Sequence, residues 1–379
     1  MFSLFSNKKK GVLSIILDIQ SGLVRGALIE DCQDSEIDGK VHVLSVVTRS
    51  ISSKTNIINS EHLTKRILKL VSEVVEHLNK DSGSGKITKV SYVLSSPWIF
   101  SKLKTVKIDY GRETEITSKT LSDIVKEEVK NNTVTADIKP IEQKIFEVRL
   151  NGYPSTTFEG KKAHTLDVSV STSFSSISFI NKVTAVVNKH THIKNSDFYS
   201  ALLLQYTALR EILKGKSEFI FIHCHNELTD IVIVKDNLCK HIASFPFGVS
   251  TFLRKIANGT GESIESSDSL LSLYQGNKLS DSEKERVSKI VNPLLTEWSS
   301  LCIQSFQDIF DPATIPRTVY LAAHSHFDLF KEVLTKEANY NFNIELYDSI
   351  DTNEGVVFKK GCALSPMIKI YALALNTVI

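Results

Sequence analysis

The feature that most restricts the fold of this chain is a pattern of three strands followed by a helix, which occurs twice in its 379 residues. The strands are predicted at Val12–Asp18, Leu23–Glu30 and Val41–Ile51, and again at Phe219–His223, Thr229–Lys235 and Cys239–Phe245. Each copy combines a small sheet with helices that can cover it. The repetition therefore predicts two similar α/β lobes.

A different pattern separates the two copies. The first lobe continues through a helix that begins near Ser60 and a strand at Lys89–Ser95. A compact α+β insert follows, with strands at Leu103–Ile108, Lys144–Leu150 and Thr165–Val170, a charged helix at Thr117–Lys130, and a second helix at Ser175–Asn188 directly behind it. We expect a flexible N-terminus at 1–10, the first lobe at 11–96 and 173–216, the insert at 97–172, the second lobe at 217–360 and a closing helix at 361–379.

Charge and cysteine content exclude several classes of protein. Lysine and arginine number 45 against 43 acidic residues, which argues against nucleic-acid binding through bulk charge. The five cysteines are scattered without CxxC spacing, so we expect a reducing cytoplasm and neither a disulfide framework nor a zinc ribbon.

No apolar run approaches the ~18 residues that span a bilayer. Phe2, Leu4 and Phe5, next to Lys8–Lys10, could touch an anionic membrane weakly, but a solvated terminus is the simpler interpretation.

Four segments resemble parts of the actin-like ATPases of the FtsA and PilM type. Ser14–Arg25 resembles the first phosphate loop, in which a strand ends in Asp-x-Gly-(Ser/Thr) and a basic residue follows. Phe146–Tyr153 and Leu166–Thr172 resemble two strands of the FtsA insert, and Ala243–Thr251 resembles the family's Pro-x-Gly-Gly turn into a helix. The resemblance implies a two-lobed actin/hexokinase/Hsp70-like fold with ribonuclease H-like lobes and a small α+β insert of the SHS2 (1C) type in the first lobe.

The nucleotide loops depart from the family pattern. The second phosphate loop of the family has an aspartate and three glycines before Thr-Thr-Asp, whereas this chain has His223 and then His225, Asn226 and Glu227 at those places. No glycine occurs within 223–230 or 321–326, and the chain as a whole has only 16 glycines. Glycine lets backbone N–H groups surround a phosphate without obstruction. We therefore expect a degenerate, non-hydrolysing site.

Some residues of the implied nucleotide cleft remain, and they leave an alternative open. They are Asp18, Ser21, Arg25, Thr229 and Asp230. The alternative is an active or weakly active ATPase that binds Mg-ATP between the lobes, with Asp18 holding Mg²⁺ through water. A sugar or acetate kinase of the same fold is a third class, and the missing glycine-bearing phosphate loop argues against it.

Four histidines suggest a further hypothesis. His223 and His225 project from the same side of a strand, and the family geometry places His324 and His326 across the same cleft. Four imidazoles could hold zinc or another transition metal. Polar side chains that fill a vacated nucleotide pocket explain the same residues.

The resemblance also implies a function. FtsA-like and PilM-like proteins are scaffolds at the cytoplasmic face of the inner membrane, where they self-associate and bind the cytoplasmic tails of membrane proteins. We expect such a scaffold, peripheral to the membrane through its partners, in cell division or type IV pilus assembly. The insert strands favour FtsA, whereas the end of the chain at Ile379, without a further amphipathic helix, favours PilM.

Overall fold

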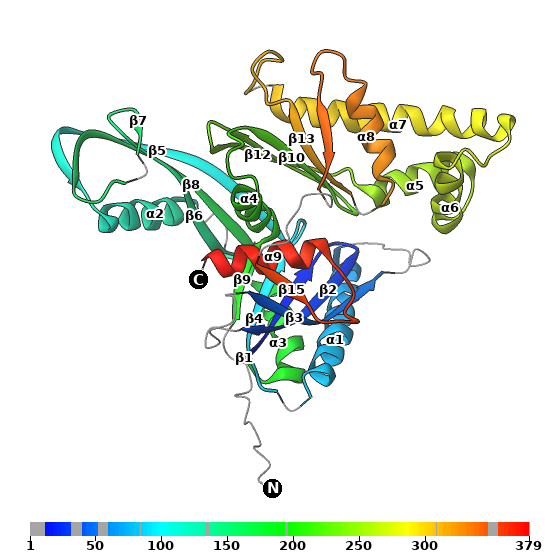
Figure 1. The fold of residues 1–379 in the computed structure, drawn as a ribbon, viewed down its shortest axis with the longest axis horizontal. Helices are drawn as coiled ribbons and strands as arrows, with labels where there is room; N and C mark the ends of the chain where they lie inside the picture. The colour runs from blue at the N-terminus through cyan, green and yellow to red at the C-terminus, as the bar shows by residue number, and fades with distance from the viewer. Residues whose placement is uncertain are drawn as a thin grey trace, which may run out of the picture.

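The computed structural model describes residues 12–31, 40–51, 60–83, 85–132, 136–155, 157–193, 196–307, 309–323, 325–347 and 355–378. The expected flexible terminus, with Phe2, Leu4, Phe5 and Lys8–Lys10, lies outside them. Within the described part, two lobes and an insert are each built on a sheet of their own (Figure 1).

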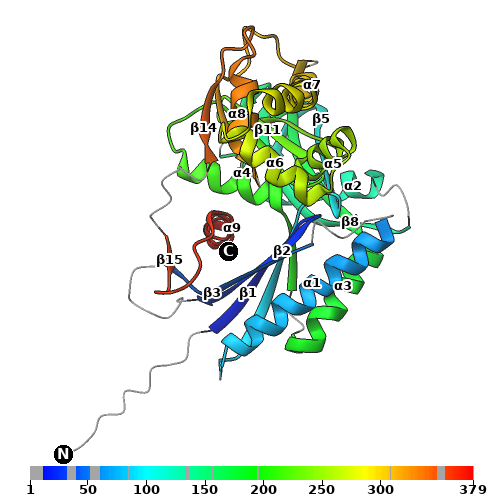
Figure 2. The ribbon, with the colours of Figure 1, turned by 90° about the vertical axis from the view of Figure 1, so that its right-hand side faces the viewer.

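The first lobe has a sheet of order β15-β3-β2-β1-β4-β9. Its strands are β1 (Val12–Ile19), β2 (Leu23–Asp31), β3 (Val41–Ser50), β4 (Ile87–Leu94), β9 (Ser196–Ser200) and β15 (Val356–Phe358). The strands β1 to β3 form an antiparallel meander, and β4 pairs parallel to β1. Helices α1 (Ser60–Asp81) and α3 (Ile177–Thr191) lie side by side on one face of this sheet (Figure 2), where they bury an aliphatic core.

The second lobe repeats this order as β12-β11-β10-β13-β14. Its strands are β10 (Phe219–Cys224), β11 (Thr229–Lys235), β12 (Leu238–Phe245), β13 (Thr318–Ala323) and β14 (Asn343–Leu346). Its helices are α5 (Val249–Thr260), α6 (Ile264–Gln275), α7 (Asp281–Gln307) and α8 (Phe327–Thr335). Again three antiparallel strands are followed by a strand parallel to the first. The duplication and the two-lobed α/β fold class are confirmed.

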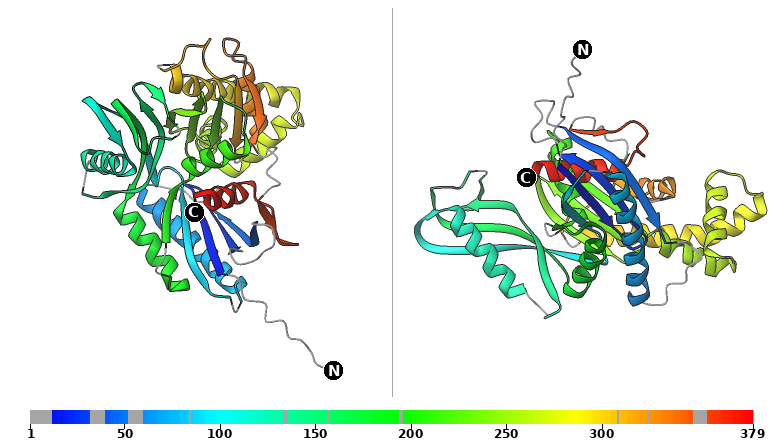
Figure 3. Two further views of the ribbon diagram at one scale, coloured as in Figure 1. Left: turned by 60° about the vertical axis from the view of Figure 1, so that its left-hand side comes forward. Right: turned by 90° about the horizontal axis from the view of Figure 1, so that it is seen from below.

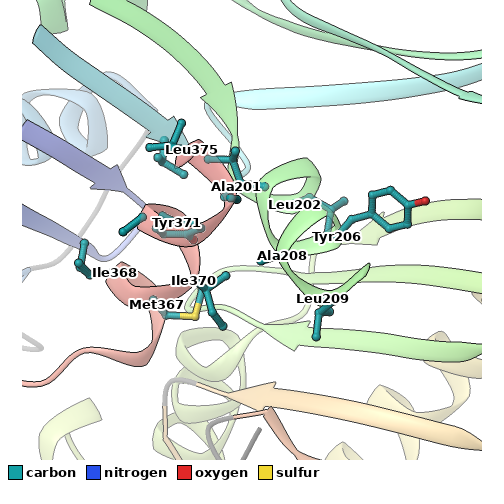
Figure 4. Close-up of a cluster of buried hydrophobic side chains, with 14 of the residues drawn as sticks. Ala201, Leu202, Tyr206, Ala208, Leu209, Met367, Ile368, Ile370, Tyr371 and Leu375 are labelled. Atoms are coloured by element: carbon teal, nitrogen blue, oxygen red, sulfur yellow. The ribbon is translucent and has the colours of Figure 1, made fainter. Parts of the chain in front are cut away.

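Two helices fill the space between the two sheets. They are α4 (Ala201–Ile212) and α9 (Pro366–Val378), whose apolar side chains meet in one cluster (Figure 4). The same cluster takes in Ile16 and Ala27 of the first sheet and Phe221 of the second. The molecule is therefore layered as helices, sheet, helices, sheet and helices, and α4 and α9 couple the lobes.

The insert stands beside this layered body (Figure 3). It consists of β5 (Ile99–Ile116), α2 (Ser118–Asn132), β6 (Ile138–Leu150), β7 (Tyr153–Pro154) and β8 (Lys161–Ser176). Its sheet has the order β5-β8-β6-β7, and α2 packs on one face over a small core of its own. The two longest insert strands extend well beyond the predicted spans, because their central part alone carries the alternation of apolar and polar residues.

Three elements, besides the two-residue strand β7, were missed by the sequence prediction. Helix α4 is apolar on nearly every side because it lies between two sheets, so it has no amphipathic stripe. Strands β9 and β15 are only five and three residues long. Because β15 pairs with β3, residues 356–358 belong to the sheet of the first lobe, and the predicted boundary at 360 is too late for this strand.

Candidate functional site between the lobes

Two turns, one from each lobe, meet where the resemblance places a nucleotide. The first joins β1 to β2, and the second joins β10 to β11. An added Cβ at Gly22 would lie 1.7 Å from Asn226 Nδ2 and 2.7 Å from Asn226 Cγ. The asparagine side chain therefore packs directly on the glycine, and the two turns are in contact.

Asp18 lies at the end of β1 beside this contact and is fully buried. Its Oδ2 accepts hydrogen bonds from Arg25 Nη1 and Gln20 Nε2, both at 3.0 Å. Burial raises the pKa of Asp18, and the charge of Arg25, the Gln20 hydrogen bond and the charge of His225 lower it in turn.

The histidines of the second turn, His223 and His225, contact polar side chains of the protein itself. His225 Nε2 lies 3.0 Å from Asp230 Oδ2, and Asp230 also accepts a hydrogen bond from Ser244. The rings of His223 and His225 stack with their centroids 3.6 Å apart. His223 Nδ1 lies 3.3 Å from Gln205 Oε1, and the amide of Gln205 donates to the Tyr371 hydroxyl. This polar chain connects the turn to α4 and α9.

Thr229, the other retained residue of the family loop, also forms hydrogen bonds with groups of the protein interior. Its hydroxyl donates to Phe247 O at 2.7 Å and accepts from Trp298 Nε1 at 2.9 Å. The hydroxyl is therefore fully used in fixing β11 against α7.

The N-terminus of α5 donates to the same turn. Val249 N–H donates to His225 O at 2.9 Å, and Ser250 N–H donates to Asn226 O at 2.6 Å. An added Cβ at Gly248 would lie 2.4 Å from His225 O, so glycine is required here for close approach. The first amides of a helix are the usual ligands of an anion. Two of them are here bonded to the protein's own carbonyl groups.

The four predicted metal-binding histidines do not form a cluster in the described structure. His326 lies against α6, where its ring nitrogens contact Gln275 Oε1 at 2.5 Å and Asp268 Oδ1 at 2.7 Å. His324 lies outside the described residues. Within the described ranges, no three His, Cys, Asp or Glu side chains gather as ligands for a metal ion.

The site residues do not fit the phosphate groups of a nucleotide. Asn226 fills the gap between the turns, and the α5 amides are already bonded. Three buried polar atoms of the two turns have no hydrogen-bond partner among the described residues: Asp18 Oδ1, Ser21 Oγ and His225 Nδ1. The arrangement joins the two lobes through the packing of Asn226 on Gly22 and through the polar chain from His223 to Gln205 and Tyr371.

Four residues of this network escaped the sequence prediction: Gln205, Ser244, Tyr371 and Trp298. Gln205 had a detectable signal, since it is a polar residue inside the apolar segment Leu202–Tyr206. Buried polar side chains of this kind are usually hydrogen-bonded to a specific partner. The other three have no local signal, because their partners are far away in the sequence.

Comparison with known proteins defines the fold. No protein-family profile matches the chain, and no curated protein sequence matches it. Among solved structures, the "PilM-PilN type IV pilus biogenesis complex" superposes with a TM-score of 0.63 at 14% identity, over 97% of this chain and 98% of that one. The ethanolamine utilization protein EutJ from Carboxydothermus hydrogenoformans gives 0.47 at 9% identity, over 96% and 89% of the two chains. A Bacteroides thetaiotaomicron protein described as having an actin-like ATPase fold and unknown function gives 0.42 at 12% identity, over 99% of both.

The likeness to the PilM structure shows that the chain shares its fold over 97% of its length. At this level of identity the likeness concerns the fold alone. None of the described helices combines the length and apolar composition needed to cross a lipid bilayer.

Proposed function

We propose that this protein is an actin-fold scaffold of the PilM type, which organises an assembly at the cytoplasmic face of the inner membrane by binding other proteins. The single observation that carries the proposal is the packing of Asn226 on Gly22. A protein that worked by binding and releasing a nucleotide would need these two turns apart. Here the side chains of the protein itself hold them together.

The choice of setting is supported by the likeness to a PilM from a complex with PilN. We therefore favour type IV pilus assembly over cell division. The partner that we propose is a membrane protein with a cytoplasmic segment, as the resemblance to scaffolds of the PilM type implies. Self-association of the scaffold belongs to the same proposal.

A calorimetric titration of the purified full chain with Mg-ATP, repeated with Mg-ADP, tests the nucleotide half of the proposal. We expect no saturable heat up to about 1 mM nucleotide. Binding with micromolar affinity would overturn the claim. It would also stabilise the protein by about 2.7 kcal/mol at a concentration one hundred times the dissociation constant, which thermal unfolding would detect independently.

The alternative, a working or weakly working ATPase, has one observation in its favour. Asp18 Oδ1 and Ser21 Oγ are buried without partners among the described residues, and they are the kind of atoms that contact a hydrated cation or a phosphate. If the titration shows binding, phosphate release should be compared between the wild type and Asp18→Asn. Hydrolysis that is lost in the variant would establish this alternative.

Cross-linking in the native cell tests the partner half of the proposal. The full chain should be cross-linked, recovered with the membrane fraction, and its partners identified by mass spectrometry. We expect a membrane protein of a pilus assembly with a cytoplasmic segment. Recovery of cell-division proteins would indicate that the scaffold acts in cell division instead of pilus assembly. Recovery of the chain in the cytoplasmic fraction, without a membrane partner, would contradict the proposal.

A further inference from the structure

We infer that the groove between the insert and the second lobe binds an extended, acidic and apolar segment of a partner protein, which adds as a β-strand. The inference deepens the proposed scaffold function, on which it rests, by naming the surface and the chemistry of the partner. None of the described residues that line this groove belongs to the two turns described above, and the groove has a volume of about 550 Å³.

Open strand edges form the two walls of the groove. β5 is the last strand on one side of the insert sheet, and β12 is the last strand on one side of the second lobe's sheet. Residues 101–105 of β5 and 240–242 of β12 line the groove. An open edge presents unpaired backbone N–H and C=O groups, to which an extended peptide can add. The walls therefore favour a peptide backbone as the ligand.

The groove continues into a second cavity. Ser101 and Ile242 line both spaces, and the second, of about 250 Å³, extends towards Ser95 and Ser200 of the first lobe. The Ser95 hydroxyl is buried and has no hydrogen-bond partner among the described residues. A segment seated in the groove would thus have an anchor for a polar side chain at its inner end.

The charge of the groove is positive. Lys102 and Lys240 line it and form no ion pair with any described residue, whereas Lys104 pairs with Glu128 at 2.8 Å. Among the described residues, Glu128 is the only acidic one in the groove itself, and Asp230 lines the second cavity. Burial lowers the pKa of His241, which keeps that ring neutral at physiological pH. Two lysines without counter-charges call for acidic side chains on the partner.

Apolar side chains alternate with the lysines along the groove. Leu103 lies between Lys102 and Lys104 on β5, and Ile242 follows His241 on β12. Ile309, which lines the groove, is 49% exposed, and Phe100, which lines the second cavity, is 41% exposed. A strand whose side chains alternate between acidic and apolar would match both sets. This pattern defines the partner segment.

Fluorescence anisotropy on the full chain tests the inference. The probe is a labelled peptide of about eight residues in which valine and glutamate alternate, a length typical of a strand. The comparison probes are the same peptide with lysine in place of glutamate, the glutamate peptide methylated at alternate backbone nitrogens, and a labelled oligothymidylate. We expect saturable binding of the first probe and at least about tenfold weaker binding of each of the others.

Variants assign the binding to the groove. The double change Lys102→Glu and Lys240→Glu should weaken binding of the glutamate peptide at least about tenfold. The matched control is Lys107→Glu, an exposed lysine of β5 outside the groove, which should leave binding unchanged. Circular dichroism and thermal unfolding of each variant would show that it is folded.

Four results would overturn the inference: no binding of the glutamate peptide up to about 1 mM, equal binding by the charge-reversed variant, full binding of the methylated peptide, or preferred binding of the oligothymidylate. The partner isolated by cross-linking provides a separate test. If that membrane partner binds the charge-reversed variant as tightly as the wild type, the groove is not the binding site for the partner. The proposed scaffold function would be unaffected by that result.

Discussion

Replacing Gly22 by alanine tests the contact that couples the two turns. The backbone of Gly22 is outside the left-handed region, so alanine meets no conformational penalty there. The obstacle is space alone. The new Cβ would meet Asn226 at Nδ2, Cγ and Cβ, at 1.7, 2.7 and 3.0 Å. Because all three atoms are too close, a small rotation of the amide cannot relieve the clash.

The expected cost follows from the mutational behaviour of overpacked sites, where an added methyl group costs about 1–3 kcal/mol. The unfolding entropy of globular proteins is about 2.1 cal/mol/K per residue, so a chain of this length carries about 0.8 kcal/mol/K. We therefore expect Tm to fall by about 1–4 °C. Whether the clash is kept as strain or relieved by parting of the turns, the folded state is destabilised.

Differential scanning calorimetry on Gly22→Ala, Asn226→Ala and the double variant measures the effect. Since Asn226→Ala removes the obstructing atoms, the double variant should be more stable than the sum of the two single changes implies. Gly276→Ala is the control, because Gly276 has φ −73° and the nearest atom to an added Cβ is 3.3 Å away. An unchanged Tm for Gly22→Ala, or strictly additive effects in the double variant, would refute the packing of Asn226 on Gly22.

Two further predictions concern buried polar groups. Thr229→Val should lower the free energy of unfolding, measured in urea, by about 1–3 kcal/mol, because it leaves Trp298 N–H and Phe247 O without partners. Thr229→Ser keeps both hydrogen bonds and is the control. Equal losses of stability in the two variants would contradict this prediction. Burial raises the pKa of Glu142, which accepts a hydrogen bond from Ser200 N–H, to about 7. Its folded pKa exceeds the unfolded value, so stability falls as pH rises between the two. Between about pH 5 and pH 8, the free energy of unfolding of Glu142→Gln should therefore rise relative to that of the wild type by up to about 3 kcal/mol. A difference in stability that does not change with pH would show that Glu142 has no raised pKa in the folded protein.

Much of the fold was predictable because its elements are locally encoded. The meander strands are short, apolar and bounded by turn residues, and the two copies carry the same pattern. The capping box at the start of α7 is another locally encoded feature: Ser280 N–H donates to Glu283 Oε2 at 3.0 Å, and Glu283 N–H donates to Ser280 Oγ at 3.4 Å. Helix α4 was missed because its burial on all sides erases the periodic signal on which such predictions depend.

The candidate site was predictable only in part. Asp18 and Arg25 were expected together from the first loop, and they form an ion pair. The stacking of His223 on His225 and the packing of Asn226 on Gly22 depend on how the lobes dock, which no local pattern encodes. A sequence that lacks phosphate-loop glycines shows what is missing from a site. The side chains that take the place of the glycines become visible only in three dimensions.

The position of α9 has a consequence for synthesis on the ribosome. The second lobe is continuous from β10 to β14, so its sheet can close as soon as that stretch has emerged. The first lobe begins at residue 12 but receives β15 and α9 only from the last part of the chain. Until then, Ile16 and Ala27 lack the α9 side chains that cover them in the finished protein. The lobe whose synthesis begins first is thus completed only when β15 and α9 have been made.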